Sequence, residues 1–127
     1  MGKGKIIMGD EPKVDWIEKS GKQCLKFSFG VHLTGKDAAD AIAQWREAFQ
    51  SRKGEKIVLI WDCKKMKGYE TSARTQWTAA LKEMKPQIDS IWLITNSSIV
   101  KMGAAVMGMV SSLTIRTVNT EDAIRVG

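Results

Sequence analysis

The sequence predicts an α/β domain built on a mixed β-sheet, and three observations support that class. Two segments, Lys56–Cys63 and Ser90–Asn96, are near-continuous apolar runs that end in small polar residues, and each precedes a helical pattern. Uninterrupted apolarity over the length of a strand indicates that both faces are covered, as in the central strands of a parallel sheet. The chain has 127 residues, 43% of them hydrophobic, which is the size and composition of one globular domain.

The first elements are expected to form a hairpin. Residues 1–12 are expected to be a loosely ordered N-terminal segment of the single domain 1–127. A first strand is predicted over Val14–Glu18, and Cys24–Phe29 alternates apolar and polar residues with the period of a half-buried strand. Ser20, Gly21 and Lys22 between them have the composition of a turn.

Two amphipathic helices are predicted around the first central strand. Thr34, with an acid three positions later, is typical of a helix start, and Gly54 is expected to end that helix. The second helix is expected to begin near Thr71 or Ser72 and to stop at Pro86, whose ring clashes with the preceding turn. Their core stripes are Ala38, Ala41, Ile42, Trp45 and Phe49, and Ala73, Trp77, Ala80, Leu81 and Met84.

The C-terminal third is expected to hold a helix, an edge strand and a short final helix. Ser97 or Ser98 is the expected cap of the third helix, the edge strand covers Leu113–Val118, and the last helix covers Thr120–Ile124. The order is β-β-α-β-α-β-α-β-α, with about five strands and about four helices. The predicted core side of the third helix consists of Ile99, Met102, Val106, Met109 and Val110.

This order of elements resembles the STAS fold, in the SpoIIAA-like branch often labelled STAS/CRAL-TRIO-like. The resemblance runs from about Val14 to Ile124 and rests on element order and one local pattern. STAS domains carry an Asp at the end of a central strand, here Asp62, and then Asp-Ser-Ser-Gly at the start of a helix. The aligned string is Glu70-Thr71-Ser72-Ala73. In family members that are regulated by phosphorylation, the first hydroxyl after the acid is the phosphorylated one. The resemblance implies that Thr71 is the equivalent residue here.

Several polar residues are predicted to lie at the carboxyl edge of the sheet, where α/β proteins bind ligands. Asp62 and Cys63 end one central strand, and successive strand residues point to opposite faces. Asp62 is expected to accept hydrogen bonds from the following loop, and Cys63 could be a reactive thiol if neighbouring lysines lowered its pKa. The other candidates are Glu70, Thr71, Ser72, Asn96, Ser97 and Ser98, either as helix caps or as a polar basin suited to an anion.

The third helix is expected to carry an interaction surface. Between Ile99 and Val110 only Lys101 is charged, and Val100, Ala104 and Met107 form a second apolar face. A helix that is apolar all round is buried, lies at an interface or lines a pocket. A homodimer interface and a pocket for a lipid-like ligand are the two interpretations. The helix is too short and too interrupted by glycine to span a bilayer.

Charge and cysteine content limit the classes of partner and function that the sequence allows. The formal charge is +6, but most lysines are scattered through the sequence. Only Lys64, Lys65 and Lys67 cluster, and no aromatic ladder lies beside them, so nucleic acid is not expected as a partner. Two distant cysteines and one histidine give no metal or redox motif, and no cofactor is expected. Without a signal-peptide pattern the chain is expected to be cytoplasmic. The resulting hypothesis is a non-enzymatic regulatory or protein-interaction domain, with a small hydrophobic ligand-binding protein as the alternative.

Overall fold

The structure is a computed structural model that describes residues 11–126, so the predicted loose segment lies largely outside the described residues. A five-stranded sheet has the order β1-β2-β4-β6-β7, in which only the β1–β2 pair is antiparallel. Its strands are β1 (Lys13–Lys19), β2 (Lys22–Ser28), β4 (Ile57–Asp62), β6 (Ile88–Ile94) and β7 (Ile115–Val118). The described helices are α1 (Gly35–Ser51), α2 (Thr71–Met84) and α3 (Ser98–Ser111), with 3-10 turns at Lys85–Gln87 (η1) and Glu121–Ala123 (η2). The predicted mixed α/β class is confirmed.

The β1–β2 hairpin turns through two residues in the left-handed region. Ser20 has φ 54° and Gly21 has φ 81°, and Lys19 pairs with Lys22 across the turn. Two-residue loops with positive φ at both positions match the right-handed twist of the flanking strands. Glycine occupies the second position at no steric cost.

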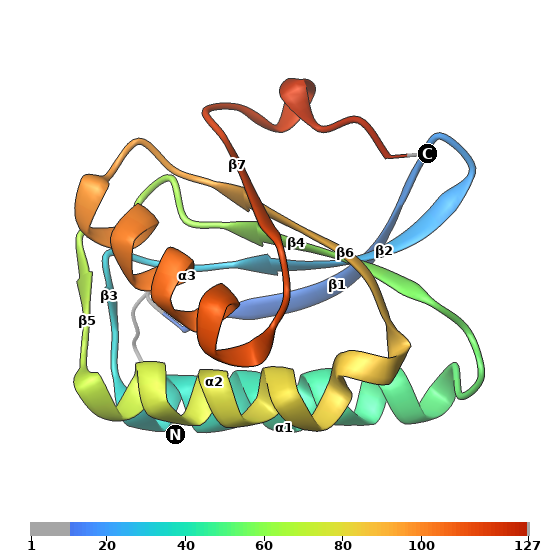
Figure 1. The fold of residues 1–127 in the computed structure, drawn as a ribbon, viewed down its shortest axis with the longest axis horizontal. Coiled ribbons are helices and arrows are strands. Elements are labelled where there is room, and N and C mark those ends of the chain that lie inside the picture. The colour runs from blue at the N-terminus through green and yellow to red at the C-terminus, as the bar shows by residue number, and fades with distance from the viewer. Residues whose placement is uncertain (1–10, 127) are drawn as a thin grey trace, which may run out of the picture.

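The sheet separates two unequal layers (Figure 1). The three helices cover one face, where Leu59, Trp61 and Leu93 point into the main core. The C-terminal segment crosses the other face, where Ile124 packs with Cys24, Val58, Ile60, Trp92 and Ile94. Both faces of β4 and β6 are therefore covered, which explains their uninterrupted apolar sequences.

Trp77 of α2 is the centre of an aromatic cluster that attaches the helical layer to the sheet. Its ring centroid lies 5.5 Å from Phe27 and 5.9 Å from Trp61 on the sheet, and 5.3 Å from Trp45 on α1. The contacts with Phe27 and Trp61 are edge-to-face, the geometry that the ring quadrupoles favour. Trp61 and Trp92, on the adjacent strands β4 and β6, are both buried.

Three features differ from the sequence predictions. The last helix is only the single turn η2, so the chain has three described α-helices rather than four. A separate two-stranded parallel sheet, β3 (His32–Leu33) with β5 (Gly68–Tyr69), was not predicted, because two-residue strands leave no periodic pattern. Third, the predicted orientation of α3 is wrong.

Helix α3 packs through its small residues and exposes its large ones. The buried residues are Val100, Gly103, Ala104, Gly108 and Ser111, whereas all five residues of the predicted core side are exposed. A Cβ at Gly108 would come within 2.7 Å of the Leu113 carbonyl oxygen, and a Cβ at Gly103 would overlap the Tyr69 hydroxyl. At Gly103 and Gly108 the inner gap leaves no room for a side chain, which decides the orientation where two apolar faces compete.

We expect Trp77→Ala to lower the free energy of unfolding by about 3–5 kcal/mol, because it leaves a cavity where the rings of two layers meet. Urea denaturation would measure the loss. The matched control is Trp16→Ala at the edge strand, where the ring is half-buried under the Arg52 guanidinium. A loss for Trp77→Ala no larger than that of the control would contradict the central role of Trp77.

Candidate functional site

Asp62 lies at the carboxyl end of β4 and points away from the helical layer. Its carboxylate accepts a hydrogen bond from the Lys64 backbone N–H at 3.2 Å, as the sequence predicted for the following loop. It also lies 3.9 Å from the Lys26 ammonium and 3.7 Å from that of Lys64. Lys26 in turn contacts Glu121 of η2 at 2.7 Å. Asp62 therefore belongs to a charge network that holds the loop and the C-terminal segment.

Cys63, the next residue, points to the opposite face and is buried. Burial raises the pKa of the Cys63 thiol far above its ordinary value, and the neighbouring Asp62 carboxylate raises it further. This is the opposite of the lowered pKa that a reactive thiol requires. The alternative of a reactive Cys63 therefore has no support from its surroundings, and Lys64 pairs with Asp62 instead.

Glu70, Thr71 and Ser72 stand where the STAS resemblance places a phosphorylation loop. Glu70 is the N-cap of α2 by position but makes no cap bond there, and its carboxylate accepts from the Gly35 N–H of α1 at 2.7 Å. Thr71 and Ser72 are exposed, and neither caps α2. Ser72 lies against Gly35, where a Cβ would overlap its hydroxyl. The predicted caps at Thr71 or Ser72 are wrong, since Glu70 instead links the starts of the two helices.

Asn96, Ser97 and Ser98 connect β6 to α3. Ser97 caps the helix, with its hydroxyl accepting from the Val100 N–H at 3.3 Å, so one of the two predicted caps is confirmed. The Ser97 N–H donates to the Thr95 hydroxyl at 3.1 Å. Among the described residues no hydrogen bond or ion pair joins this group to Glu70, Thr71 or Ser72. The structure thus gives the two groups separate structural roles and does not join them into one polar basin.

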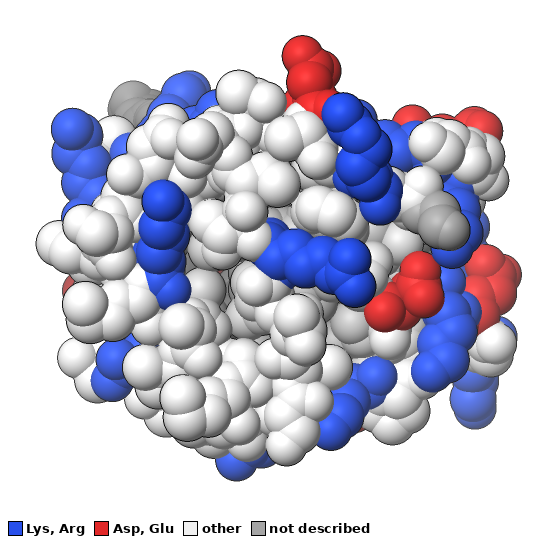
Figure 2. All heavy atoms as spheres, turned by 45° about the horizontal axis from the view of Figure 1, so that its top comes forward, with Lys and Arg blue, Asp and Glu red and all other residues white. Residues whose placement is uncertain are grey.

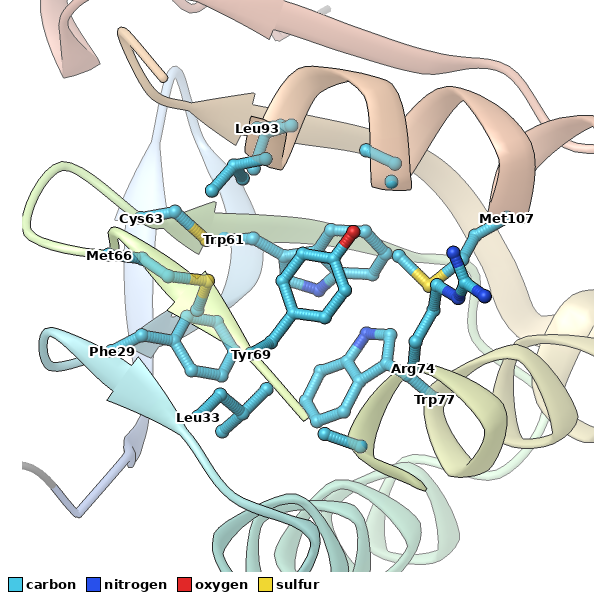
Figure 3. Close-up of a pocket in the computed structure, with 14 residues that line it drawn as sticks. Phe29, Leu33, Trp61, Cys63, Met66, Tyr69, Arg74, Trp77, Leu93 and Met107 are labelled. Atoms are coloured by element: carbon cyan, nitrogen blue, oxygen red, sulfur yellow. The ribbon is translucent and has the colours of Figure 1, made fainter. Parts of the chain in front are cut away.

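An apolar cavity of about 50 Å³ occupies the space between this end of the sheet, α2 and α3. Figure 3 shows Phe29, Trp61 and Trp77 around it, with Cys63 and Met66 at one end. Val100, Ala104 and Met107, the predicted interface residues of α3, line the cavity instead. Val100 and Ala104 are buried in the core, so the interface assigned to them is wrong.

Two half-buried residues, Tyr69 and Arg74, lie at the rim of the cavity. Strand pairing of Tyr69 with Leu33 fixes its backbone, and its hydroxyl reaches Gly103 of α3. Figure 3 shows the Arg74 guanidinium between Trp77 and Met107. The sequence interpretation missed both residues. Arg74 carried a usable signal, because it lies one position after Ala73 and three before Trp77, at the margin of the buried stripe.

The outer side of α3 forms an apolar surface, defined here as the α3 stripe: Ile99, Met102, Val106, Met109 and Val110. Met102 is 68% exposed and Met109 is 79% exposed. Figure 2 shows that uncharged atoms dominate the lower left of the face it presents, crossed by few Lys or Arg side chains. Contiguous apolar surface of this kind marks an interaction site more often than chance exposure does.

Residues 11–126 contain neither a cluster suited to a metal ion nor a membrane-spanning helix. Within this range there is no group of three His, Cys, Asp or Glu side chains placed to hold a metal ion. None of its helices combines the length and apolarity needed to cross a membrane.

We expect both thiols to be unreactive in the folded protein near neutral pH, because burial raises the pKa of Cys63 and of Cys24. Stability should fall as pH rises above the ordinary thiol pKa of about 8.5, since only the unfolded chain can then ionise its thiols. A chromogenic disulfide reagent would measure reactivity, with the denatured protein as the control. Rapid labelling of Cys63 in the native state would contradict this assignment.

Comparison with known proteins identifies the fold. No family model matches the chain, and no curated protein matches it in sequence. Among solved structures it is similar to an uncharacterized protein from the DUF3478 family with a SpoIIAA-like fold, from Shewanella loihica PV-4. The TM-score is 0.75 over 94% of each chain, at 13% sequence identity. The protein therefore has the SpoIIAA-like fold of STAS domains, as the sequence resemblance implied.

Proposed function

We propose that this protein is a non-enzymatic regulatory or protein-interaction domain that acts by self-association through the α3 stripe. The single observation that carries the proposal is the exposure of five large apolar side chains on one helix face. The reactive-thiol alternative has no support in the environment of Cys63, where burial raises the thiol pKa. The proposed interaction role is argued from the exposed side chains and not from the fold, because one fold hosts many functions.

The spacing of the α3 stripe suits packing against another helix. Ile99, Met102, Val106 and Met109 follow each other at intervals of three, four and three residues. This is the spacing of the apolar seam in coiled coils, where each side chain enters a space between residues of the facing helix. The inner face of α3 is already buried in the domain core and is not available to a partner.

A second copy of the chain is the partner that this stripe fits best. In an antiparallel pair related by a two-fold axis, Ile99 of one copy would meet Met109 of the other, and Met102 would meet Val106. Such an interface is self-complementary, as two-fold symmetry requires. Lys101 is the only charge between Ile99 and Val110, so the pairing brings few like charges together.

The alternative function, binding of a small hydrophobic ligand, is favoured by the apolar cavity. Its volume of about 50 Å³ is well below the roughly 300–1,000 Å³ of drug-sized ligand pockets. The cavity therefore supports a compact apolar group better than a lipid chain.

We expect Met109→Glu to weaken self-association about tenfold or more, because burying a charge against an apolar partner costs at least ~1.4 kcal/mol. Sedimentation velocity over a range of concentrations would measure the change. Gln50→Glu on the exposed side of α1 adds the same charge away from the stripe and should leave association unchanged. A wild-type chain that remains monomeric at high concentration would contradict the proposal, as would equal weakening by both variants.

A further inference from the structure

We propose that the cavity beneath Tyr69 binds a small aromatic carboxylic acid, with its ring among the aromatic side chains and its carboxylate on Arg74. The proposal deepens the alternative function above and is independent of self-association through the α3 stripe. It rests on three features of residues 11–126: the apolar wall, a rim cation without a hydrogen-bond or ion-pair partner in this range, and a rim tyrosine whose hydroxyl has no hydrogen bond in this range.

The cavity wall suits an aromatic ring. Phe29, Trp61 and Trp77 supply three aromatic side chains, and Met66 adds a polarisable sulfur. Aromatic rings favour edge-to-face and offset contacts with one another, and thioethers pack well against ring edges. The buried Cys63 thiol stays neutral because burial raises its pKa, so no charge opposes an apolar occupant.

Arg74 supplies the group that would recognise a carboxylate. Among the described residues, its guanidinium takes part in no hydrogen bond or ion pair. By contrast Arg46, on the neighbouring helix, binds Glu83 through two nitrogens at 2.8 and 2.9 Å. A planar guanidinium matches a carboxylate through two parallel hydrogen bonds. An unpaired arginine beside a wholly apolar cavity therefore points to a ligand with one acidic end and one apolar end.

Tyr69 covers the cavity, and an outward turn of its ring would enlarge the cavity. At about 50 Å³ the cavity is smaller than the roughly 150 Å³ site that is known to take up benzene. The Tyr69 ring is itself the size of the ring to be admitted, so turning it outward frees the missing volume. Among residues 11–126 the Tyr69 hydroxyl makes no hydrogen bond, and it lies against Gly103. Outward rotation therefore breaks packing contacts alone.

The test uses benzoate as the acidic probe and toluene as its neutral counterpart. Both are titrated into the full-length protein while the indole N–H signals of Trp61 and Trp77 are followed by NMR. We expect saturable shifts of both signals with each probe. Arg74→Gln should weaken benzoate binding about tenfold or more and leave toluene binding unchanged, because only the charge-assisted pair is lost.

Four further variants make the result specific. Lys101→Gln removes a cation of α3 that does not line the cavity, and it should change neither probe. Ala104→Val fills the cavity and should abolish binding of both. If that variant does not fold, Tyr69→Ala tests the same point by opening the mouth, which should strengthen binding of both probes. Met109→Glu should bind benzoate like the wild type, which separates this proposal from self-association.

Absence of saturable shifts with benzoate would overturn the proposal. So would equal weakening of benzoate binding by Arg74→Gln and Lys101→Gln, because that result would indicate a general surface charge effect. Binding of toluene without benzoate would overturn the carboxylate assignment.

Discussion

The edge-to-face packing of Trp77 against the sheet is the contact on which the rest of the architecture depends. Trp77 lies against Phe27 of β2 and Trp61 of β4, and it also meets Trp45 of α1. One side chain thereby fixes α2 against two parallel strands and a neighbouring helix. Each such pair contributes about 0.5–1.5 kcal/mol beyond the burial of its area. Because α2 is held there, its first turn brings Glu70 to the start of α1 and Arg74 to the cavity rim.

Helix α3 carries two surfaces with different tasks. Its small residues let the backbone approach Tyr69 and the Leu113 carbonyl, and they leave an apolar cavity behind the helix. Its large residues are consequently turned outward into the α3 stripe. The ligand site and the association surface that we propose thus share one helix while using different side chains. This division follows from close packing at Gly103 and Gly108, where an added Cβ would collide with Tyr69 and with the Leu113 carbonyl oxygen.

The polar residues at the carboxyl ends of the strands are used mainly to connect elements. Asp62 holds its own loop and pairs with Lys26, and Glu70 joins the N-terminus of α2 to that of α1. Ser97 caps α3. A carboxylate at a helix N-terminus is favoured by the unpaired N–H groups and by the helix dipole. These contacts give Asp62, Glu70 and Ser97 structural roles at this end of the sheet.

The sequence by itself determined the strands of the main sheet, the three described α-helices and the order of both. Unbroken apolarity in β4 and β6 identified central strands, period two identified β2, and Thr34 and Pro86 marked where helices begin and end. Those signals are local, because covered faces, caps and proline act within a few residues. The five-stranded sheet and the burial of Trp45, Trp61, Trp77 and Trp92 agree with them. The SpoIIAA-like fold was implied by the family resemblance, and the structural comparison supports it.

Only the tertiary structure decided which neighbours the polar loop residues contact. It also decided which side of the apolar helix α3 faces the core. Glu70 binds Gly35, 35 residues away in sequence, and no local pattern encodes that distance. Helix α3 is apolar on both sides, so its periodicity was equally compatible with either orientation, and the clearance at Gly103 and Gly108 selected one. The candidate site changed for the same reason: Arg74 and Tyr69 acquire their places only when α2, α3 and β5 are packed together.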